Sequence, residues 1–152
     1  MGVIVVGVDQ SEGAKAALRF ALEEARLRQA KLRVVHAWQF GVHRRSRFRG
    51  LATRGRRRLG RVSRSRGGRP RRNLRGVVAD GVAIERRVDQ GAAAPVLIEE
   101  SRDADVLVVG SRGHGGFAQL LLGSVSQQCA QHAVCPVVIV RDTAKNGHEG
   151  VS

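Results

Sequence analysis

Hydrophobic residues in the first 38 positions follow a strand pattern, then a helix pattern, then a strand pattern again. Val3 to Val8 is an apolar run broken only by Gly7, which predicts a strand buried on both faces of a parallel sheet. One apolar stripe at helical spacing follows it, formed by Ala14, Ala17, Leu18, Ala21, Leu22 and Ala25. Leu32 to Trp38 predicts a second strand, so this stretch forms a strand-helix-strand unit.

The same alternation resumes near residue 82. Apolar residues between Val82 and Val88 mark a strand, and residues 92–101 predict a short helix with Pro95 in its first turn. Residues 104–109 predict another strand that is buried on both faces of the sheet.

The last elements follow a glycine-rich loop. A helix is expected to begin at Gly123-Ser124, and Val137 to Val140 predicts the final strand. Residues 142–152 lack such a pattern and are expected to form a flexible tail. This order predicts a single α/β domain over residues 1–141, a doubly wound open sheet of about five parallel strands flanked by helices.

The net charge of the chain is +14, and one segment carries the excess. Residues 43–75 contain 15 arginines, no lysine and no acidic residue, which leaves 12 of the 27 basic residues and all 13 acidic residues elsewhere. An arginine run favours a nucleic-acid-binding arm, because it attracts the phosphate backbone without needing a fold. The rest of the chain is nearly neutral and gives no such indication.

Composition and apolar run length bear on location and redox chemistry. No apolar run approaches the roughly 20 residues of a membrane helix, and no basic stretch precedes the first strand as in a signal peptide. We therefore expect a cytoplasmic protein without membrane contact. Cys129 and Cys135 are too few for a disulfide framework and lack zinc-site spacing, so they are expected to be small apolar residues with inert thiols.

The loop after Val109 carries the strongest chemical signal. Ligands of open parallel sheets bind beyond the carboxyl ends of the strands, which is where this loop lies. It contains four glycines within seven residues: Gly110, Gly113, Gly115 and Gly116. Glycines let backbone amides approach an anion, and Ser124 at a helix start adds a hydroxyl and unpaired amides. One or two glycines would indicate a tight turn, but four followed by Gly-Ser favour a phosphate site.

Other nucleotide and catalytic motifs fit less well. Residues 113–118 match the dinucleotide fingerprint, but that motif opens a domain of several strands and here only one strand follows. None of the three lysines stands in a Walker A loop, and no Gly-x-Ser-x-Gly elbow occurs. His36 and His132 are expected to be structural, whereas His114 in the glycine loop is a candidate ligand contact. The sequence identifies no catalytic residue and no metal site.

The spacing of the loop glycines resembles a known nucleotide-binding pattern. Gly110, two residues, Gly113, nine residues and then Gly123-Ser124 match, at every fixed position, the pattern of the universal stress protein family. The beginning of the chain around Val6 to Asp9 and its ending at 135–141 also resemble this family. The likeness covers residues 1–42 and 77–141, and is to its single-domain, ATP-binding members.

The resemblance implies a fold of the universal stress protein and adenine nucleotide alpha hydrolase kind, with ATP, alone or with Mg²⁺, across the strand ends. Asp9 would contact the nucleoside or its metal, and Ala37 would line the base. Ribose and phosphates would be surrounded by Gly110, Arg112, Gly113, Gly123, Ser124, Val125 and Ser126. Arg112 stands where the family commonly has histidine, a difference that still suits an anion.

The resemblance also implies a stress-response regulator with at most weak ATP hydrolysis, and a homodimer formed through the last strand. Two alternatives stay open, an ATP-hydrolysing enzyme and a nucleic-acid-binding protein that uses residues 43–75. In the family this region supplies an amphipathic helix, whereas here it holds five glycines and scattered apolar residues. We favour a segment altered by a change of reading frame, and expect residues 43–75 to be disordered or poorly packed.

Overall fold

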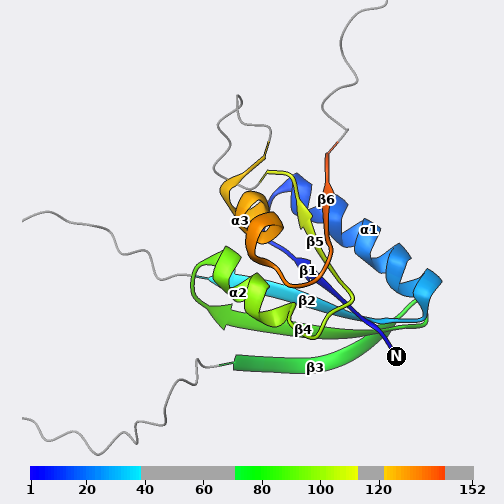
Figure 1. Ribbon diagram of the computed structural model, residues 1–152. Helices are drawn as coiled ribbons and strands as arrows, with labels where there is room; N and C mark the ends of the chain where they lie inside the picture. The colour runs from blue at the N-terminus through cyan, green and yellow to red at the C-terminus, as the bar shows by residue number, and fades with distance from the viewer. Residues whose placement is uncertain (39–70, 113–121, 143–152) are drawn as a thin grey trace, which may run out of the picture.

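The computed structural model describes residues 1–38, 71–112 and 122–142 (Figure 1). These residues form six strands and three helices. In chain order they are β1 (Val3–Gly7), α1 (Glu12–Arg28), β2 (Lys31–Trp38), β3 (Arg71–Ala79), β4 (Val82–Gln90), α2 (Ala93–Glu100), β5 (Val106–Gly110), α3 (Ser124–His132) and β6 (Val137–Val140).

The strands form one sheet in the order β3-β4-β2-β1-β5-β6. Four of the five pairings are parallel, and only β3 runs antiparallel to its neighbour β4. Helix α1 covers one face of this sheet, while α2 and α3 cover the other (Figure 1). The doubly wound α/β fold is therefore confirmed, and the structure adds one antiparallel edge strand to the five parallel strands that were expected.

The added strand belongs to a tight hairpin. Asp80 and Gly81 join β3 to β4 with positive φ angles of 52° and 79°, as a two-residue type I′ turn requires. Residues 71–75 of the arginine-rich segment, which we expect to be disordered or poorly packed, form the first part of β3. Residues 43–70 lie outside the described part of the chain, as do residues 143–152 of the expected tail.

Helix α1 begins and ends where its sequence supplies caps. The hydroxyl oxygen of Ser11 accepts a hydrogen bond from the backbone N–H of Ala14 at 3.1 Å, and Glu12 lies in the positive first turn. At the other end Gln29 adopts the left-handed conformation that closes many helices. These caps set the position at which α1 crosses the sheet.

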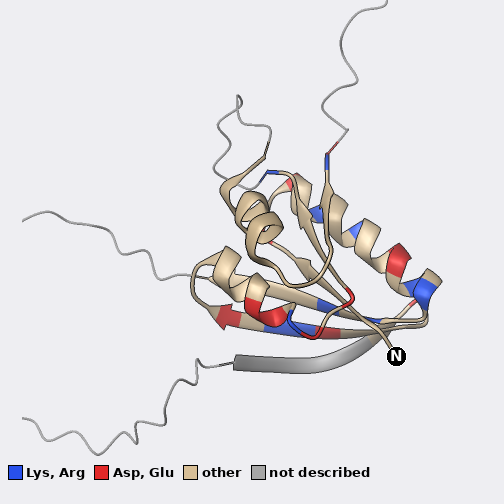
Figure 2. Ribbon diagram, viewed as in Figure 1, with Lys and Arg blue, Asp and Glu red and all other residues tan. Residues whose placement is uncertain are grey.

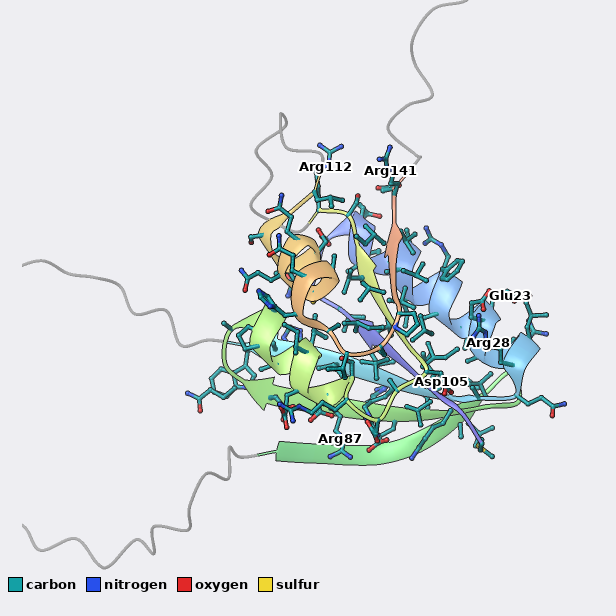
Figure 3. The ribbon with its side chains drawn as sticks, viewed as in Figure 1. Glu23, Arg28, Arg87, Asp105, Arg112 and Arg141 are labelled. Atoms are coloured by element: carbon teal, nitrogen blue, oxygen red, sulfur yellow. The ribbon has the colours of Figure 1, made fainter. Side chains whose placement is uncertain are left out.

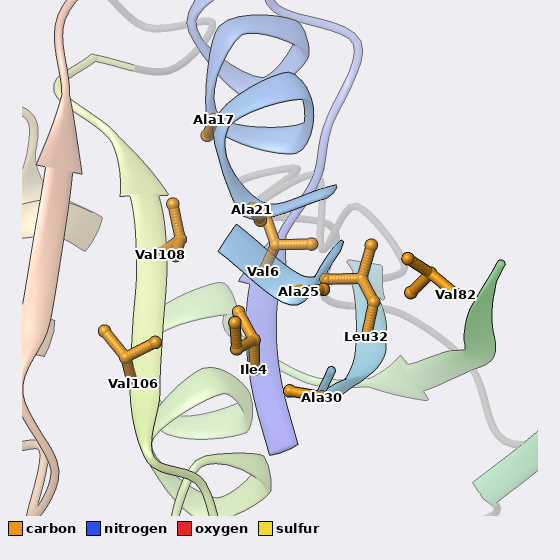
Figure 4. Packing of buried hydrophobic residues seen from close by; sticks show 10 residues of the cluster. All are labelled: Ile4, Val6, Ala17, Ala21, Ala25, Ala30, Leu32, Val82, Val106 and Val108. Carbon is orange, nitrogen blue, oxygen red and sulfur yellow. The ribbon is translucent and has the colours of Figure 1, made fainter. Parts of the chain in front are cut away.

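The apolar core lies between α1 and the central strands (Figure 4). Ala17, Ala21 and Ala25 are completely buried, and their small side chains let α1 lie close to the sheet. The sheet presents larger side chains to them, among which Ile4 and Leu32 are also completely buried. Burial of each such branched side chain stabilises the fold by about 1.5 to 3 kcal/mol.

A second apolar cluster fills the space under α2 and α3. Its members include Leu97 of α2, Leu107 of β5 and Cys129 of α3, which is fully buried. Burial, with a smaller contribution from Cys135, raises the pKa of the Cys129 thiol to about 11. At neutral pH this thiol is protonated, which agrees with the inert role expected for it.

Strand β4 differs from the central strands because one of its faces is charged. Glu85, Arg87 and Asp89 alternate along β4, on the side where the neighbouring Val35 packs into the cluster beneath α2. The carboxylate of Glu85 lies 3.2 Å from Lys31 Nζ and 3.4 Å from Arg33 Nε, and it also pairs with Arg87. Glu85 is thus the common partner of three cations.

Arg33 extends this ion-pair network from β2 to the loop after α2. Its guanidinium donates to both carboxylate oxygens of Asp103, at 2.7 and 3.1 Å, and to the carbonyl oxygen of Glu100 at 2.8 Å. The hydrogen bond from Arg33 lowers the pKa of Asp103. Burial alone would raise the pKa of Glu85, but Lys31, Arg87 and Arg33 outweigh it and hold that pKa below its usual value.

No helix among the described residues is long and apolar enough to cross a membrane. The longest of them, α1, has 17 residues, and its outer face is charged (Figure 2).

Candidate functional site

The first turn of α1 and the end of β5 touch through their backbones at the carboxyl end of the sheet. A Cβ atom at Gly110 would lie 2.8 Å from the carbonyl carbon of Gly13, and one at Gly13 would lie 2.8 Å from the carbonyl oxygen of Arg112. Both separations are too short for a real side chain, so glycine is required at both positions. The pair brings the first turn of α1 against the end of β5 and the start of the loop that follows it.

Asp9 lies in the loop between β1 and α1, directly beyond the end of β1, and is exposed. One oxygen of its carboxylate, Oδ1, accepts a hydrogen bond from the backbone N–H of Ser11 at 2.7 Å. The interaction holds the loop in the shape from which Ser11 caps α1. The second carboxylate oxygen has no hydrogen-bond partner among the described residues.

The end of β5 is joined to the start of α3 by hydrogen bonds to one carbonyl group. The oxygen of Ser111 accepts from the backbone N–H of Gly123 at 2.7 Å and lies 3.1 Å from the hydroxyl oxygen of Ser126. That hydroxyl also lies 2.9 Å from the oxygen of Gly123. Ser126 is 1% exposed, so its side chain positions the helix start, and any ligand contact would come from its backbone.

The first turn of α3 has backbone N–H groups that no side chain of the described residues caps. Gly123 caps the helix in an extended conformation, and no side chain of the described residues accepts a hydrogen bond at this cap. Ser124, the first helical residue, is exposed, and Val125 is half-buried against the apolar cluster beneath α2 and α3. These unpaired N–H groups and the positive end of the helix dipole suit an anion.

Strand β2 supplies the far end of the site. Ala37 is half-buried near its carboxyl end, two strands away from Gly110 in the order β2-β1-β5. The Nδ1 atom of His36 lies 3.1 Å from the carbonyl oxygen of Val8, so this histidine is a structural residue as expected. His132 is exposed in the last turn of α3, at the end of the helix away from the glycine loop.

The structure brings eight of the nine predicted site residues to the carboxyl end of the sheet. Arg112 follows β5 and is exposed (Figure 3), whereas Gly113 and the candidate His114 lie outside the described residues. Sequence reasoning missed Gly13, whose signal was its place two residues after the cap Ser11, where the helix should favour a side chain. It also assigned the freedom of Gly110 to a ligand, although close packing alone already requires it.

Among the residues that the structure describes, no group of three or more His, Cys, Asp or Glu side chains could hold a metal ion. Asp9 is the carboxylate of the site that could share a cation with bound phosphates. Such a cation would need the ligand itself to complete its coordination.

A family model described as the universal stress protein family matches residues 1–141. A universal stress protein of Mycolicibacterium smegmatis is 50% identical over 60 residues, which cover 40% of this chain and 20% of that protein. Universal stress protein Rv2623 of Mycobacterium tuberculosis is 35% identical over 144 residues, 92% of this chain and 45% of its own. The chain thus spans about half or less of these mycobacterial relatives.

Solved structures show the same fold. The universal stress protein UspA of Lactobacillus plantarum superposes with a TM-score of 0.63 at 14% identity, covering 92% of this chain and 97% of its own. A universal stress protein in complex with cAMP gives a TM-score of 0.57 at 24% identity, with coverages of 91% and 95%. These structures share the fold, and the match of the family model over residues 1–141 shows that the chain belongs to the universal stress protein family.

Proposed function

We propose that this chain binds an adenine nucleotide, ATP in particular, across the carboxyl ends of β2, β1 and β5. The observation that carries the proposal is the backbone contact between Gly13 and Gly110, because it brings the start of α1, shortly after Asp9, against the end of β5, shortly before Arg112. A carboxylate for the sugar, a guanidinium and a helix N-terminus for the phosphates make a chemically complete nucleotide site.

Related structures support the adenine part of the proposal. One neighbour is described as a complex with cAMP, and another, from Archaeoglobus fulgidus, as a complex with dAMP. The second has a TM-score of 0.54 at 21% identity and covers 91% of this chain. Adenine would lie at Ala37, and the phosphates would lie over Gly110, Gly113, Gly123 and the first turn of α3.

We infer a regulatory rather than a catalytic role. Hydrolysis needs a base or a metal held beside the terminal phosphate, and among the described residues that we propose as contacts Asp9 is the only carboxylate. Asp9 also lies on the nucleoside side of the site and already holds the loop through Ser11. Binding would report nucleotide levels in the cytoplasm under stress, with turnover of ATP slow at most.

The first test is mass spectrometry of small molecules released from the purified chain, followed by calorimetry with ATP. Ser124→Asp should remove ATP binding, because a carboxylate at the start of α3 repels phosphate. The same carboxylate stabilises the helix dipole, so lost binding could not be attributed to unfolding. Ser124→Asn is the neutral control and should bind ATP within a few-fold of the unchanged chain. Equal ATP affinity in all three proteins would refute this site.

We also infer a homodimer formed through β6. The carbonyl oxygen of Pro136, just before β6, accepts from Leu107 at 2.9 Å, and that of Val140 accepts from Ser111, just after β5, at 2.8 Å. The backbone groups of the even-numbered residues of β6 therefore face β5. In a parallel ladder the backbone groups of the intervening residues, Val137 and Ile139, then point to the open edge. An apolar edge with free donors and acceptors is a template for a second copy.

Nucleic-acid binding is the second candidate, favoured only by the arginines of residues 43–75. If that segment were a selected arm, log affinity should fall linearly with log salt, at roughly 0.9 per phosphate contact. If it arose from a shifted reading frame, the neighbouring frame of the gene should encode an acidic and apolar stretch with helical spacing. Resequencing the gene separates the two origins.

A further inference from the structure

Two exposed arginines stand side by side at the carboxyl edge of the sheet. Gly110 and Val140 are partners in the β5–β6 register, and the backbone N–H of Ser111 donates to the carbonyl oxygen of Val140 at 2.8 Å. Arg112 and Arg141 therefore follow the ends of neighbouring strands. Figure 3 shows both side chains at this end of the molecule, pointing away from the sheet.

Neither guanidinium is neutralised within the described part of the chain. Most other basic side chains there have a carboxylate within 4 Å, as in the pairs that Arg26, Arg28, Arg33 and Arg102 make. Arg112 and Arg141 have no such partner among the described residues. Asp142, the residue after Arg141, is engaged in an interaction of its own. Two positive charges without a carboxylate partner at one edge of the sheet favour the binding of an anion there.

The order of the strands indicates which anion reaches Arg141. Along β2-β1-β5-β6 the proposed contacts are Ala37 for the base, Asp9 for the sugar and the Gly110 loop for the phosphates. Three strand spacings of about 4.8 Å separate β2 from β6, or about 14 Å in all. An extended nucleoside triphosphate has a comparable length, whereas a monophosphate ends over β5.

We propose that Arg141 contacts the terminal phosphate of the bound nucleotide and makes this chain selective for ATP over AMP and cyclic AMP. The inference rests on the proposed function, since it assumes a nucleotide at the same edge. Arg112 would contact the phosphates nearer the sugar, and Arg141 the one farthest from it. A planar guanidinium suits this task because it donates two parallel hydrogen bonds to a phosphate.

The test is calorimetry of the full chain with ATP, ADP, AMP and cyclic AMP, repeated for Arg141→Gln. The substitution should weaken ATP binding about tenfold, as for the loss of one charge-assisted hydrogen bond at an exposed site, and leave AMP affinity unchanged. Arg141→Lys should retain part of the ATP preference. Because Arg141 adjoins β6, light scattering should confirm the same oligomeric state in each protein.

Arg19→Gln is the matched control. Arg19 is exposed on α1 and has no ion pair among the described residues, so its loss should change no nucleotide affinity. Unchanged ATP affinity in Arg141→Gln, or an equal loss for ATP and AMP, would overturn the role of Arg141 while leaving the proposed function intact. Absence of binding by all four nucleotides in the unchanged chain would overturn both.

Discussion

The strands on the two sides of β1 are stabilised by different kinds of interaction. On one side β5 is apolar along its whole length, and Leu107 and Val108 are completely buried. On the other side β2 and β4 carry an ion-pair network in which Glu85 is 6% exposed and Arg33 is 8% exposed. Burial of apolar surface depends little on pH or salt, whereas paired charges lose their value when one partner is neutralised.

The strands on the two sides of β1 therefore contribute differently to the site and to the stability of the fold. Among the described residues no buried charge lies beneath the β5 half of the site, so its glycines, the amides of α3 and the exposed Arg112 and Arg141 are the polar groups available to a ligand. The charges on β2 and β4 are satisfied by one another and connect α2 to the sheet. Only Arg87 Nε and Asp89 Oδ1 are buried there without a hydrogen-bond partner among the described residues.

The largest expected effect comes from removing Glu85. Glu85→Ala leaves Lys31, Arg33 and Arg87 without their shared acceptor, and breaking a buried pair in this way costs about 3 to 5 kcal/mol. Urea unfolding at pH 7 should show this loss in the free energy of unfolding. A loss below about 1 kcal/mol would mean that the network contributes no more than surface ion pairs do.

Acidification should distinguish the two sides directly. The pKa of Glu85 is lowered from its ordinary value of 4.5, so its stabilisation is complete above that pH and is lost as the pH falls through the folded-state value. Asp103, lowered from 3.8, acts in the same direction. Glu85→Gln should therefore flatten the dependence of unfolding free energy on pH below 5.

Leu107→Ala is the comparison on the apolar side. It should cost about 2 to 5 kcal/mol through the lost contacts and the cavity, by the same amount at pH 4 and pH 7. A pH-dependent cost for Leu107→Ala would contradict the division between the two sides.

Gly110→Ala should have a smaller effect on stability. The added methyl group would press on the backbone of Gly13, and overpacking of this kind costs about 1 to 3 kcal/mol. Thermal unfolding measures the lost stability. Calorimetry should show weaker ATP binding, because the start of α1 and the end of β5 are forced apart. Full stability in this variant would mean that α1 and β5 can move apart at Gly13 and Gly110 without a loss of folding free energy.

The smallest effect on the monomer is expected from Ile139→Pro. The backbone N–H of Ile139 points to the open edge, so proline should abolish the dimer and leave the pairing of β6 with β5 largely intact. Val138→Pro is the matched control, since it removes a donor to β5 and should destabilise the fold itself. Light scattering that reports a monomer for the unchanged chain would contradict the proposed dimer.

Most of the fold could be predicted from local patterns. The strands at Val3–Gly7, Lys31–Trp38 and Val137–Val140 were expected to within one residue at each end, because apolar runs of this length are read directly as buried strands. Strand β3 was not predicted, because the arginines at its beginning interrupt the apolar pattern of a strand. The Asp80-Gly81 turn between apolar residues was a hairpin signal that could have revealed its end.

Contacts between distant residues could not be read in this way. Arg33 and Glu85 are 52 positions apart, and their partnership depends on β2 and β4 becoming neighbours across a long connection. The proposed phosphate contacts at Gly110 and Gly123 were found from glycine spacing alone, since both come from one continuous stretch. Arg141 needed the strand order, because nothing in the sequence says that β6 lies beside β5.

The contact between Gly13 and Gly110 also bears on how a ligand would bind. The first turn of α1 and the end of β5 meet through backbone atoms at these two glycines, which have no side-chain rotamers to lose when a ligand arrives. For these described parts of the site, the conformational entropy is lost during folding and not when a ligand binds. Affinity gained in this way comes from preorganisation, and ligand association needs no slow rearrangement of the start of α1 or the end of β5.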